Sequence, residues 1–276
     1  ISSQTSSGLD RDYITNWSYG IGETLTLLVP NVKGGGSGST MSQSEAAMAK
    51  ANPMYNGIYS QLPQYFGEQP WTAGPVYVGA FVMFLFVLGC FIVKGPLKWA
   101  LLGATIFSIL LSWGKNFMGL TDFFIDYVPM YNKFRAVSSI LVIAEFTIPL
   151  LAIFALKEIL SKPDMLKQEK NCRGVIAALV LTAGVALILA VAPGTFFSSF
   201  ITTQEMTALK QALPAEHLAP FVANLTEMRE AIIASDAWRS FFIIVIGCLF
   251  LFLYQLRKLK ASFTLAGVRS EERRVG

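Results

Sequence analysis

The sequence predicts an all-α membrane protein with about five transmembrane helices and an extracytosolic segment of mixed structure and amphipathic helices. Two values support this fold class: 53% of the residues are hydrophobic and 14% are charged, whereas about 25% of a soluble domain is charged. The third observation is that the apolar residues are gathered in long runs. This composition excludes a disordered chain and most soluble enzymes. We therefore expect the lipid bilayer as a partner, and no nucleic acid.

Five runs meet or approach the length of about 20 apolar residues that a helix needs to cross a bilayer core of about 30 Å. They are residues 75–93, 97–113, 137–156, 174–192 and 240–256. The last run is short unless Trp238 and Tyr254 anchor it at the two membrane surfaces. Buried helices of a soluble protein are the alternative, but they would need a larger polar shell than 14% charged residues can supply.

Lys and Arg residues predict the orientation, because cytoplasmic loops are enriched in them. The connections 94–98 and 157–173 and the tail 257–276 hold 13 of the 22 Lys and Arg residues, and the other regions hold nine. The predicted domains follow from the runs and these charges. They are an outer segment 1–74, four transmembrane helices in 75–192 with an outer loop 114–136 and an inner loop 157–173, outer amphipathic helices in 193–239, a fifth transmembrane helix 240–256 and a cytoplasmic tail 257–276.

The outer segments carry local signals of their own. Thr202 and Glu205 have the spacing of a capping box, and apolar stripes follow on both sides of Pro214. Because the opposite faces of these stripes are acidic, we expect them to pack against protein rather than against anionic lipid. The Gly-rich run 34–39 predicts a mobile loop. It is a poor phosphate cradle, because Lys33 precedes the run instead of following it.

The stretch 113–146 holds the candidate substrate-binding residues. Lys115, Tyr131, Lys133 and Arg135 lie there among aromatic and acidic side chains close to a predicted membrane surface. This mixture suits a ligand with an apolar tail and an anionic head, and Arg offers a planar fork to phosphate oxygens. The alternative is that Lys133 and Arg135 anchor a helix end at the headgroups while the aromatic residues form an interfacial belt.

Three other features could carry chemistry. Glu145 is predicted about two and a half turns inside the third span, where an ionisable group is costly and is a functional candidate by default. A hydrogen bond to a neighbouring helix is the simpler interpretation. The Asp-Arg-Asp triplet at 10–12 could hold a divalent metal, although a solvated loop is the commoner structure. The three Cys and one His make no zinc set, so we expect neither a metal nor a cofactor.

Segments 8–35, 65–80 and 112–146 together resemble the YfhO family of bacterial multi-pass membrane proteins. The element Pro-Met-Tyr-Asn-Lys-Phe-Arg at 129–135 is similar to the family's Pro-x-x-x-x-x-Arg feature before a membrane span. The resemblance implies a likeness to GT-C-type glycosyltransferases, which take a sugar from a polyprenyl-phosphate carrier at the outer face of the cytoplasmic membrane. It also implies that the chain is an internal or C-terminal portion of a longer protein, whose catalytic carboxylate lies upstream.

The resulting hypothesis is a transferase of the bacterial cytoplasmic membrane that moves a sugar from a polyprenyl-phosphate donor to a cell-envelope polymer or lipid. Arg135, helped by Lys133, would grip the donor phosphate. A transporter or flippase for an envelope precursor is one alternative, in which Glu145 and a kink at Pro149 line a path through the membrane. A non-catalytic scaffold for envelope assembly is the other.

Overall fold

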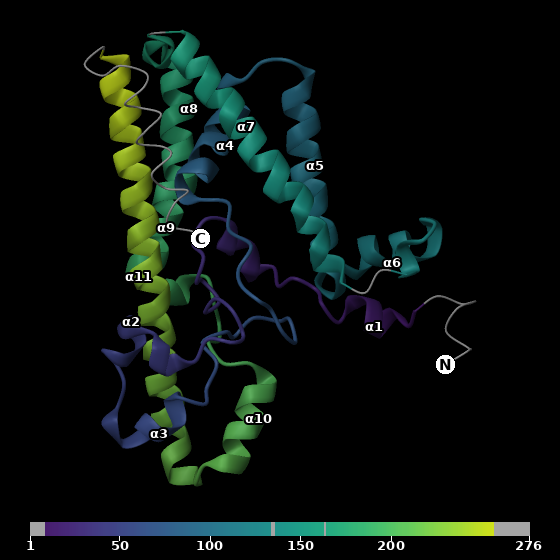
Figure 1. Cartoon of the computed structure of the whole chain (residues 1–276), viewed down its shortest axis with the longest axis vertical. Coiled ribbons are helices and arrows are strands. Elements are labelled where there is room, and N and C mark those ends of the chain that lie inside the picture. The colour runs from purple at the N-terminus through teal and green to yellow at the C-terminus, as the bar shows by residue number, and fades with distance from the viewer. Residues whose placement is uncertain (1–8, 134–135, 163, 257–276) are drawn as a thin grey trace.

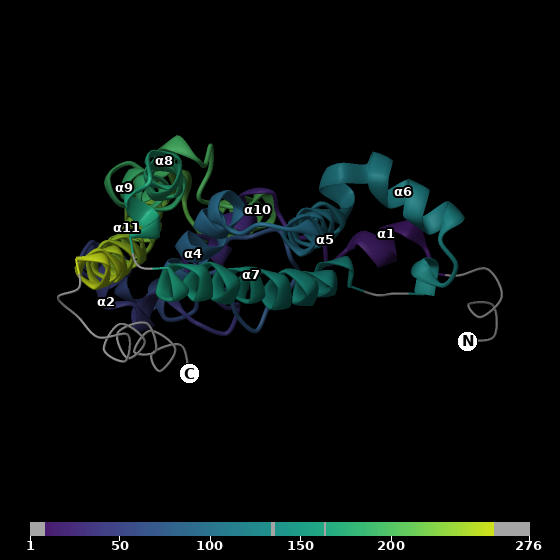
Figure 2. The ribbon, with the colours of Figure 1, turned by 90° about the horizontal axis from the view of Figure 1, so that it is seen from above.

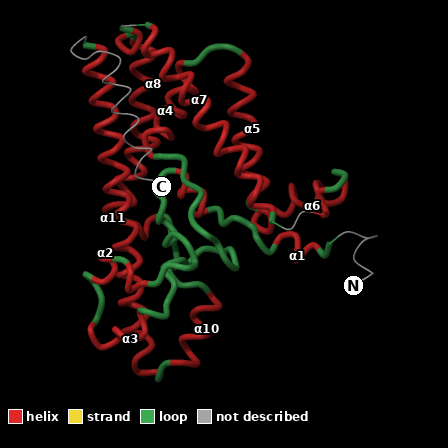
Figure 3. The backbone as a smooth tube through the Cα atoms, viewed as in Figure 1, coloured by secondary structure: helices red, strands yellow, loops and turns green. Residues whose placement is uncertain are grey.

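The computed structural model describes residues 9–133, 136–162 and 164–256, and within these ranges every regular element is a helix. An isolated bridge pairs Thr40 with Pro63. Figure 1 shows long helices side by side in the upper part of the molecule and short helices below them, and Figure 3 shows loops gathered between the two parts. The prediction of an all-helical fold is confirmed for the described residues.

The upper part, here called the apolar layer, follows the five predicted runs. It consists of α4 (Ala80–Ile92), α5 (Pro96–Ser112), α7 (Val142–Ser161), the continuous stretch of α8 (Glu169–Leu179), a π-helical turn (Val180–Gly184) and α9 (Val185–Val191), and the C-terminal part of α11 (Ala215–Gln255). Among the described residues, Val137–Ser161, Glu169–Val191 and Ala215–Gln255 are long and apolar enough to cross a membrane. Helix α5 and the stretch Gly114–Tyr127 meet at a bend of 108°. If this bent pair counts as one span, the number of candidate spans rises to four.

Helix α4 is shorter than the run that predicts it. The run begins at Pro75, but the helix begins at Ala80, because Gly79 adopts a φ of 100°, outside the helical region. The helix has 13 residues and is therefore about 20 Å long, less than the bilayer core of about 30 Å. Five complete spans consequently stay a prediction.

Small residues let the helices of the apolar layer approach closely. Gly89 of α4 lies where a Cβ atom would be 3.1 Å from the side chain of Leu151 and 3.3 Å from that of Ala155 on α7. The Thr105 and Thr147 hydroxyls join α5 to α7 by a hydrogen bond of 2.7 Å. These contacts hold α4, α5 and α7 together around a buried apolar core.

The outward surface of the apolar layer is itself apolar. Exposed large side chains occur on each of its helices, for example Phe91, Ile106, Phe146, Ile153, Val180, Val191, Ile246 and Phe252. Soluble monomers rarely expose apolar surface on this scale. The exposed side chains support a lipid-facing position for this layer.

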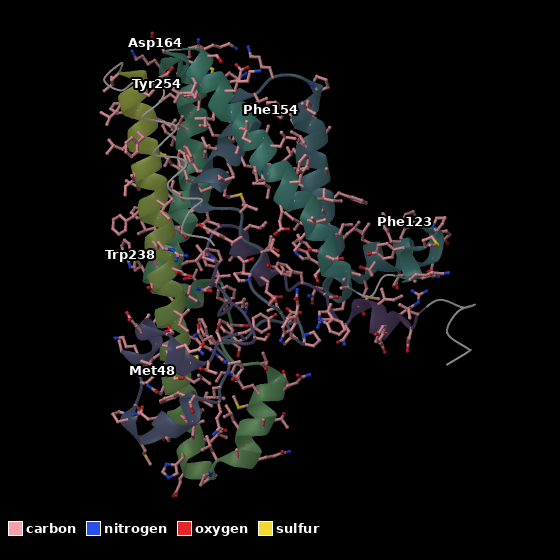
Figure 4. All side chains as sticks on the ribbon, viewed as in Figure 1. Met48, Phe123, Phe154, Asp164, Trp238 and Tyr254 are labelled. Carbon is pink, nitrogen blue, oxygen red and sulfur yellow. The ribbon has the colours of Figure 1, made fainter. Side chains whose placement is uncertain are left out.

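Helix α11 crosses the boundary predicted at residue 240 without a break. Its 41 residues make it about 62 Å long, twice the thickness of a bilayer core, so about half of it extends beyond the layer. Figure 4 shows Tyr254 near the upper end of α11, Trp238 about midway, and Met48 beside its lower half. Trp238 and Tyr254 therefore lie at the two ends of the part that runs along the apolar layer.

The lower region comprises residues 9–79, 113–133, 136 and 192–239. Its α-helices are α1 (Arg11–Thr15), α2 (Glu45–Met48), α3 (Asn56–Tyr59), α6 (Met118–Tyr127), α10 (Thr203–Ala212) and the N-terminal half of α11. Short 3₁₀ helices occur in the described chain at Gly22–Leu27, Met41–Gln43, Pro53–Tyr55, Gly114–Phe117, Tyr131–Lys133, Val137–Leu141, Met165–Lys167 and Pro193–Thr195.

A second core lies in the lower region. The apolar stripes of α10 and α11 pack against α2, α3 and Met41, with Phe221 between the rings of Tyr55 and Tyr59 at centroid distances of 5.0 and 6.0 Å. The prediction that these stripes pack against protein is confirmed. Thr202 caps α10 by accepting the Glu205 N–H at 3.2 Å.

Candidate functional site

Glu23 is a carboxylate buried in the lower region. It lies in the 3₁₀ helix Gly22–Leu27, and its exposed fraction is 2%. Its Oε2 accepts a hydrogen bond of 2.6 Å from the Gly20 N–H, and its Oε1 accepts one of 2.6 Å from the Tyr65 hydroxyl. Burial raises the pKa of Glu23, and these two hydrogen bonds oppose that effect. Such a carboxyl group can exchange a proton closer to neutral pH than an exposed one can.

The close approach of Glu23 and Tyr65 depends on a glycine. A Cβ atom on Gly67 would clash with both Oε1 of Glu23 and the Tyr65 hydroxyl. The Tyr65 hydroxyl also accepts the Gln69 N–H at 2.9 Å, so its position is fixed from two sides. The segment 65–69 therefore packs closely against the Glu23 carboxylate through Tyr65 and Gly67.

Lys33 is the basic residue that lines the same site as this carboxylate. Its Nζ lies 4.2 Å from the centroid of the Phe197 ring and 4.8 Å from that of Phe66. Burial lowers the pKa of Lys33, while the charges of Glu23 and Glu68 act in the opposite direction. The two aromatic rings stabilise the ammonium group where water is partly excluded.

Glu23 and Lys33 line a common cavity of about 10 Å³, here called the Glu23 cavity. Its other lining residues are Tyr19, Thr26, Pro30, Gly35, Tyr65, Gln69, Thr72, Gly74 and Pro75. A space of this size admits one water molecule or one hydroxyl group. The cavity thus brings one acid, one base and several hydroxyl groups around a hydroxyl-sized space.

Of the predicted binding residues, Lys115 is the one that the fold brings close to the residues around the Glu23 cavity. It follows α5, and its Nζ lies 3.9 Å from Oε2 of Glu68. Asn116 donates a hydrogen bond of 2.8 Å to the same carboxylate. Because the charge of Glu68 influences both Glu23 and Lys33, Lys115 belongs to the electrostatic surroundings of the cavity.

The other predicted binding residues lie elsewhere. Tyr131 and Lys133 form the ends of a 3₁₀ turn after α6. The Tyr131 ring is half-buried at 5.4 Å from the ring of Phe124, and burial raises its pKa, whereas Lys133 is exposed. Neither lines the Glu23 cavity. Arg135 lies outside the described residues.

Comparisons with models of protein families, with curated proteins and with solved structures find no match.

Glu145 is the ninth residue of the candidate span Val137–Ser161, so it lies as far along the span as predicted. A 3₁₀ helix precedes α7, so Glu145 lies in the first turn of α7, is exposed, and is close enough to the lower region for its charge to act on Tyr19. A carboxylate in the first turn is favourable, because the N–H groups of a helix start carry partial positive charge.

The structure also describes the Gly-rich run 34–39 and the Asp-Arg-Asp triplet at 10–12. The Gly-rich run packs closely against the chain: Gly34 and Gly35 have φ values of 84° and 80°, and a Cβ atom on Gly34 would clash with the backbone of Gln64. In the triplet at 10–12, Arg11 pairs with Asp122 and Asp126 of α6, and no group of described residues could hold a metal ion.

Glu23, Lys33 and Tyr65 are not among the site residues that the sequence predicts. A signal existed for Glu23, because it is the only ionisable residue in 20–32 and an isolated acid in an apolar run is a candidate for burial. No local signal links it to Tyr65, which is 42 residues away. Their contact arises only when the two loops fold together.

Proposed function

We propose that this chain is part of a multi-pass transferase of the bacterial cytoplasmic membrane. It would move a sugar from a polyprenyl-phosphate donor to a hydroxyl of a cell-envelope polymer or lipid at the outer face. The observation that carries the proposal is the buried carboxyl group of Glu23, which shares a hydroxyl-sized cavity with Lys33 at one end of the apolar layer. An acceptor hydroxyl needs such a base.

In this proposal the acceptor oxygen attacks the anomeric carbon of the sugar, and the bond from that carbon to the phosphate oxygen breaks. The hydroxyl proton passes to the Glu23 carboxylate, whose raised pKa favours its uptake. Polyprenyl phosphate leaves, and of the candidate cations Lys115, Lys133 and Arg135 we assign its charge first to Lys115, because Lys133 lies apart from the cavity. Lys115 is the best placed of the three, through its contact with Glu68.

The proposed topology has five spans, with residues 1–74 outside and the C-terminus in the cytoplasm. Figure 1 shows the α4–α5 connection, the α7–α8 connection and the end of α11 at the same end of the apolar layer. These are the connections rich in Lys and Arg, so this end would face the cytoplasm. The Glu23 cavity is then at the outer surface, where a polyprenyl-phosphate sugar would be presented.

The test is transfer of radiolabelled sugar from a polyprenyl-phosphate donor by the full-length protein in membranes. Glu23→Gln is expected to lower kcat by about 10²- to 10⁴-fold, the usual contribution of a general base. Lys115→Gln is expected to raise KM for the donor about tenfold or more with a smaller change in kcat. Arg135→Ala is expected to abolish transfer and leave membrane insertion intact.

Glu216→Gln is the matched control, since its carboxylate is 80% exposed and should have no effect. If Glu23→Gln transfers sugar at the normal rate while Arg135→Ala does not, the catalytic carboxylate lies upstream, as the family resemblance implies. If the unchanged protein transfers no sugar from any such donor, the transferase proposal is wrong, and translocation of a labelled precursor across vesicles tests the transport alternative.

A further inference from the structure

Helix α6 leaves the apolar layer at a sharp angle. The chain bends by 108° between α5 and the stretch Gly114–Tyr127. Gly114 permits the bend with a φ of 43°, and a Cβ atom there would clash with the Ser18 hydroxyl. Figures 1 and 2 show α6 extending sideways from the lower end of α5, with α1 alongside it.

The two faces of α6 differ in their chemistry. Asp122 and Asp126, one turn apart, both pair with the guanidinium of Arg11 on α1, the second at 2.5 Å. Phe123 and Tyr127 lie on another face, with ring centroids 5.3 Å apart and exposed fractions of 53% and 74%. Figure 4 shows Phe123 on the side of α6 toward the apolar layer. The acidic face is thus paired with Arg11 of α1, and the aromatic face has no protein covering it among the described residues.

The aromatic face continues the exposed apolar surface of the neighbouring span. Phe124 of α6 contacts the ring of Phe107 on α5 at a centroid distance of 5.5 Å. Phe107 is 44% exposed, and Ile106 beside it is 49% exposed. A lipid leaflet that covers α5 would therefore meet α6 at the contact between Phe107 and Phe124.

We propose that α6 lies in the plane of the membrane interface, with Phe123 and Tyr127 inserted at the boundary between headgroups and acyl chains. The acidic face points to water, where Arg11 offsets one of its two negative charges. A ring with a polar tip, such as that of Tyr127, is suited to this boundary. The inference is independent of the transferase proposal and applies equally to a transporter or a scaffold.

The test is the depth of spin labels in the full-length protein reconstituted in phosphatidylcholine vesicles. Single cysteines are placed at Phe123, Tyr127 and Asp126 after replacement of the three free cysteines Cys90, Cys172 and Cys248. Electron paramagnetic resonance then compares collisions with oxygen, which concentrates in lipid, and with a water-soluble nickel chelate. Phe252→Cys, 59% exposed in the apolar layer, is the lipid standard, and Glu216→Cys, 80% exposed, is the water standard.

Labels at Phe123 and Tyr127 are expected to resemble the lipid standard, with an oxygen-to-nickel collision ratio at least several-fold above that at Glu216. The label at Asp126 is expected on the water side of both. Two results overturn the proposal: equal ratios at Phe123 and Glu216, which place the face in water, or low collision with both reagents at Phe123, which places it against protein. Circular dichroism identifies any label that prevents folding and insertion. In that case the fluorescence of Phe123→Trp is measured in vesicles of brominated lipid, where quenching places the side chain in lipid and its absence places it in water or against protein.

Discussion

Arg229 and Glu205 form a two-pronged ion pair in the lower region, with N–O distances of 2.7 and 2.8 Å. Arg229 has no exposed surface, and it also donates to the carbonyl oxygens of Phe200 and Pro63 at 2.6 and 3.0 Å. One side chain of α11 therefore holds α10, the loop before it and the segment 63–66. The pair also positions Phe66, whose ring lies beside both Arg229 and Lys33.

We predict that Arg229→Ala lowers the free energy of unfolding by about 3–5 kcal/mol, because it leaves a carboxylate and two carbonyl groups without their buried donor. Denaturant unfolding of the solubilised chain measures this value. Arg173→Ala is the control: it removes an exposed i,i+4 pair with Glu169 and should cost no more than about 0.5 kcal/mol. Equal losses in the two variants would show that Arg229 does not join these elements.

A second prediction concerns pH. Burial raises the pKa of Glu23 above its ordinary value of about 4.3, so the folded state binds its proton more tightly than the unfolded state does. The free energy of unfolding contributed by Glu23 therefore falls as pH rises from about 4.3 to the raised pKa, and is constant above it. Glu23→Gln removes this contribution.

The check is denaturant unfolding of both proteins between about pH 4 and pH 8. The unchanged protein should lose stability relative to the Gln variant as pH rises through this window. A difference between the two that does not vary with pH would mean that Glu23 titrates normally.

A third prediction tests the close approach at Gly67. Gly67→Ala is expected to cost about 1–3 kcal/mol, since the added methyl group forces Glu23 and Tyr65 apart in a packed site. Gly57→Ala is the matched change, because nothing lies within 4 Å of its added methyl group and it belongs to helix α3. It should be neutral or slightly stabilising. Two equally stable variants would refute the geometry described for Glu23 and Tyr65.

A fourth prediction tests orientation in the membrane. Glu216→Cys and Glu169→Cys replace side chains that are 80% and 81% exposed on opposite sides of the apolar layer. In a background without the other cysteines, a membrane-impermeant thiol reagent should label position 216 in intact spheroplasts and position 169 only after lysis. The reverse pattern would put the basic connections outside and the Glu23 cavity in the cytoplasm.

The sequence predicted the helical stretches well, because each is a local apolar pattern. It missed the start of α4 at Ala80, which depends on the backbone of Gly79, and the continuity of α11 through residue 240. Of the four candidate binding residues, Lys115 lies beside the Glu23 cavity network, Tyr131 and Lys133 lie apart from the cavity, and Arg135 is outside the described residues.

The sequence by itself determined the all-helical apolar layer, the separation of its basic connections from the rest, and the amphipathic stripes of α10 and α11. Each of these features depends on residues that are close along the chain, because it follows from the spacing of the apolar residues and the positions of the charged ones. Only the tertiary structure decided which polar residues meet. Glu23, Lys33 and Tyr65, like Arg229 and Glu205, come from separate loops and helices. Their burial follows from packing between elements, which no local pattern encodes.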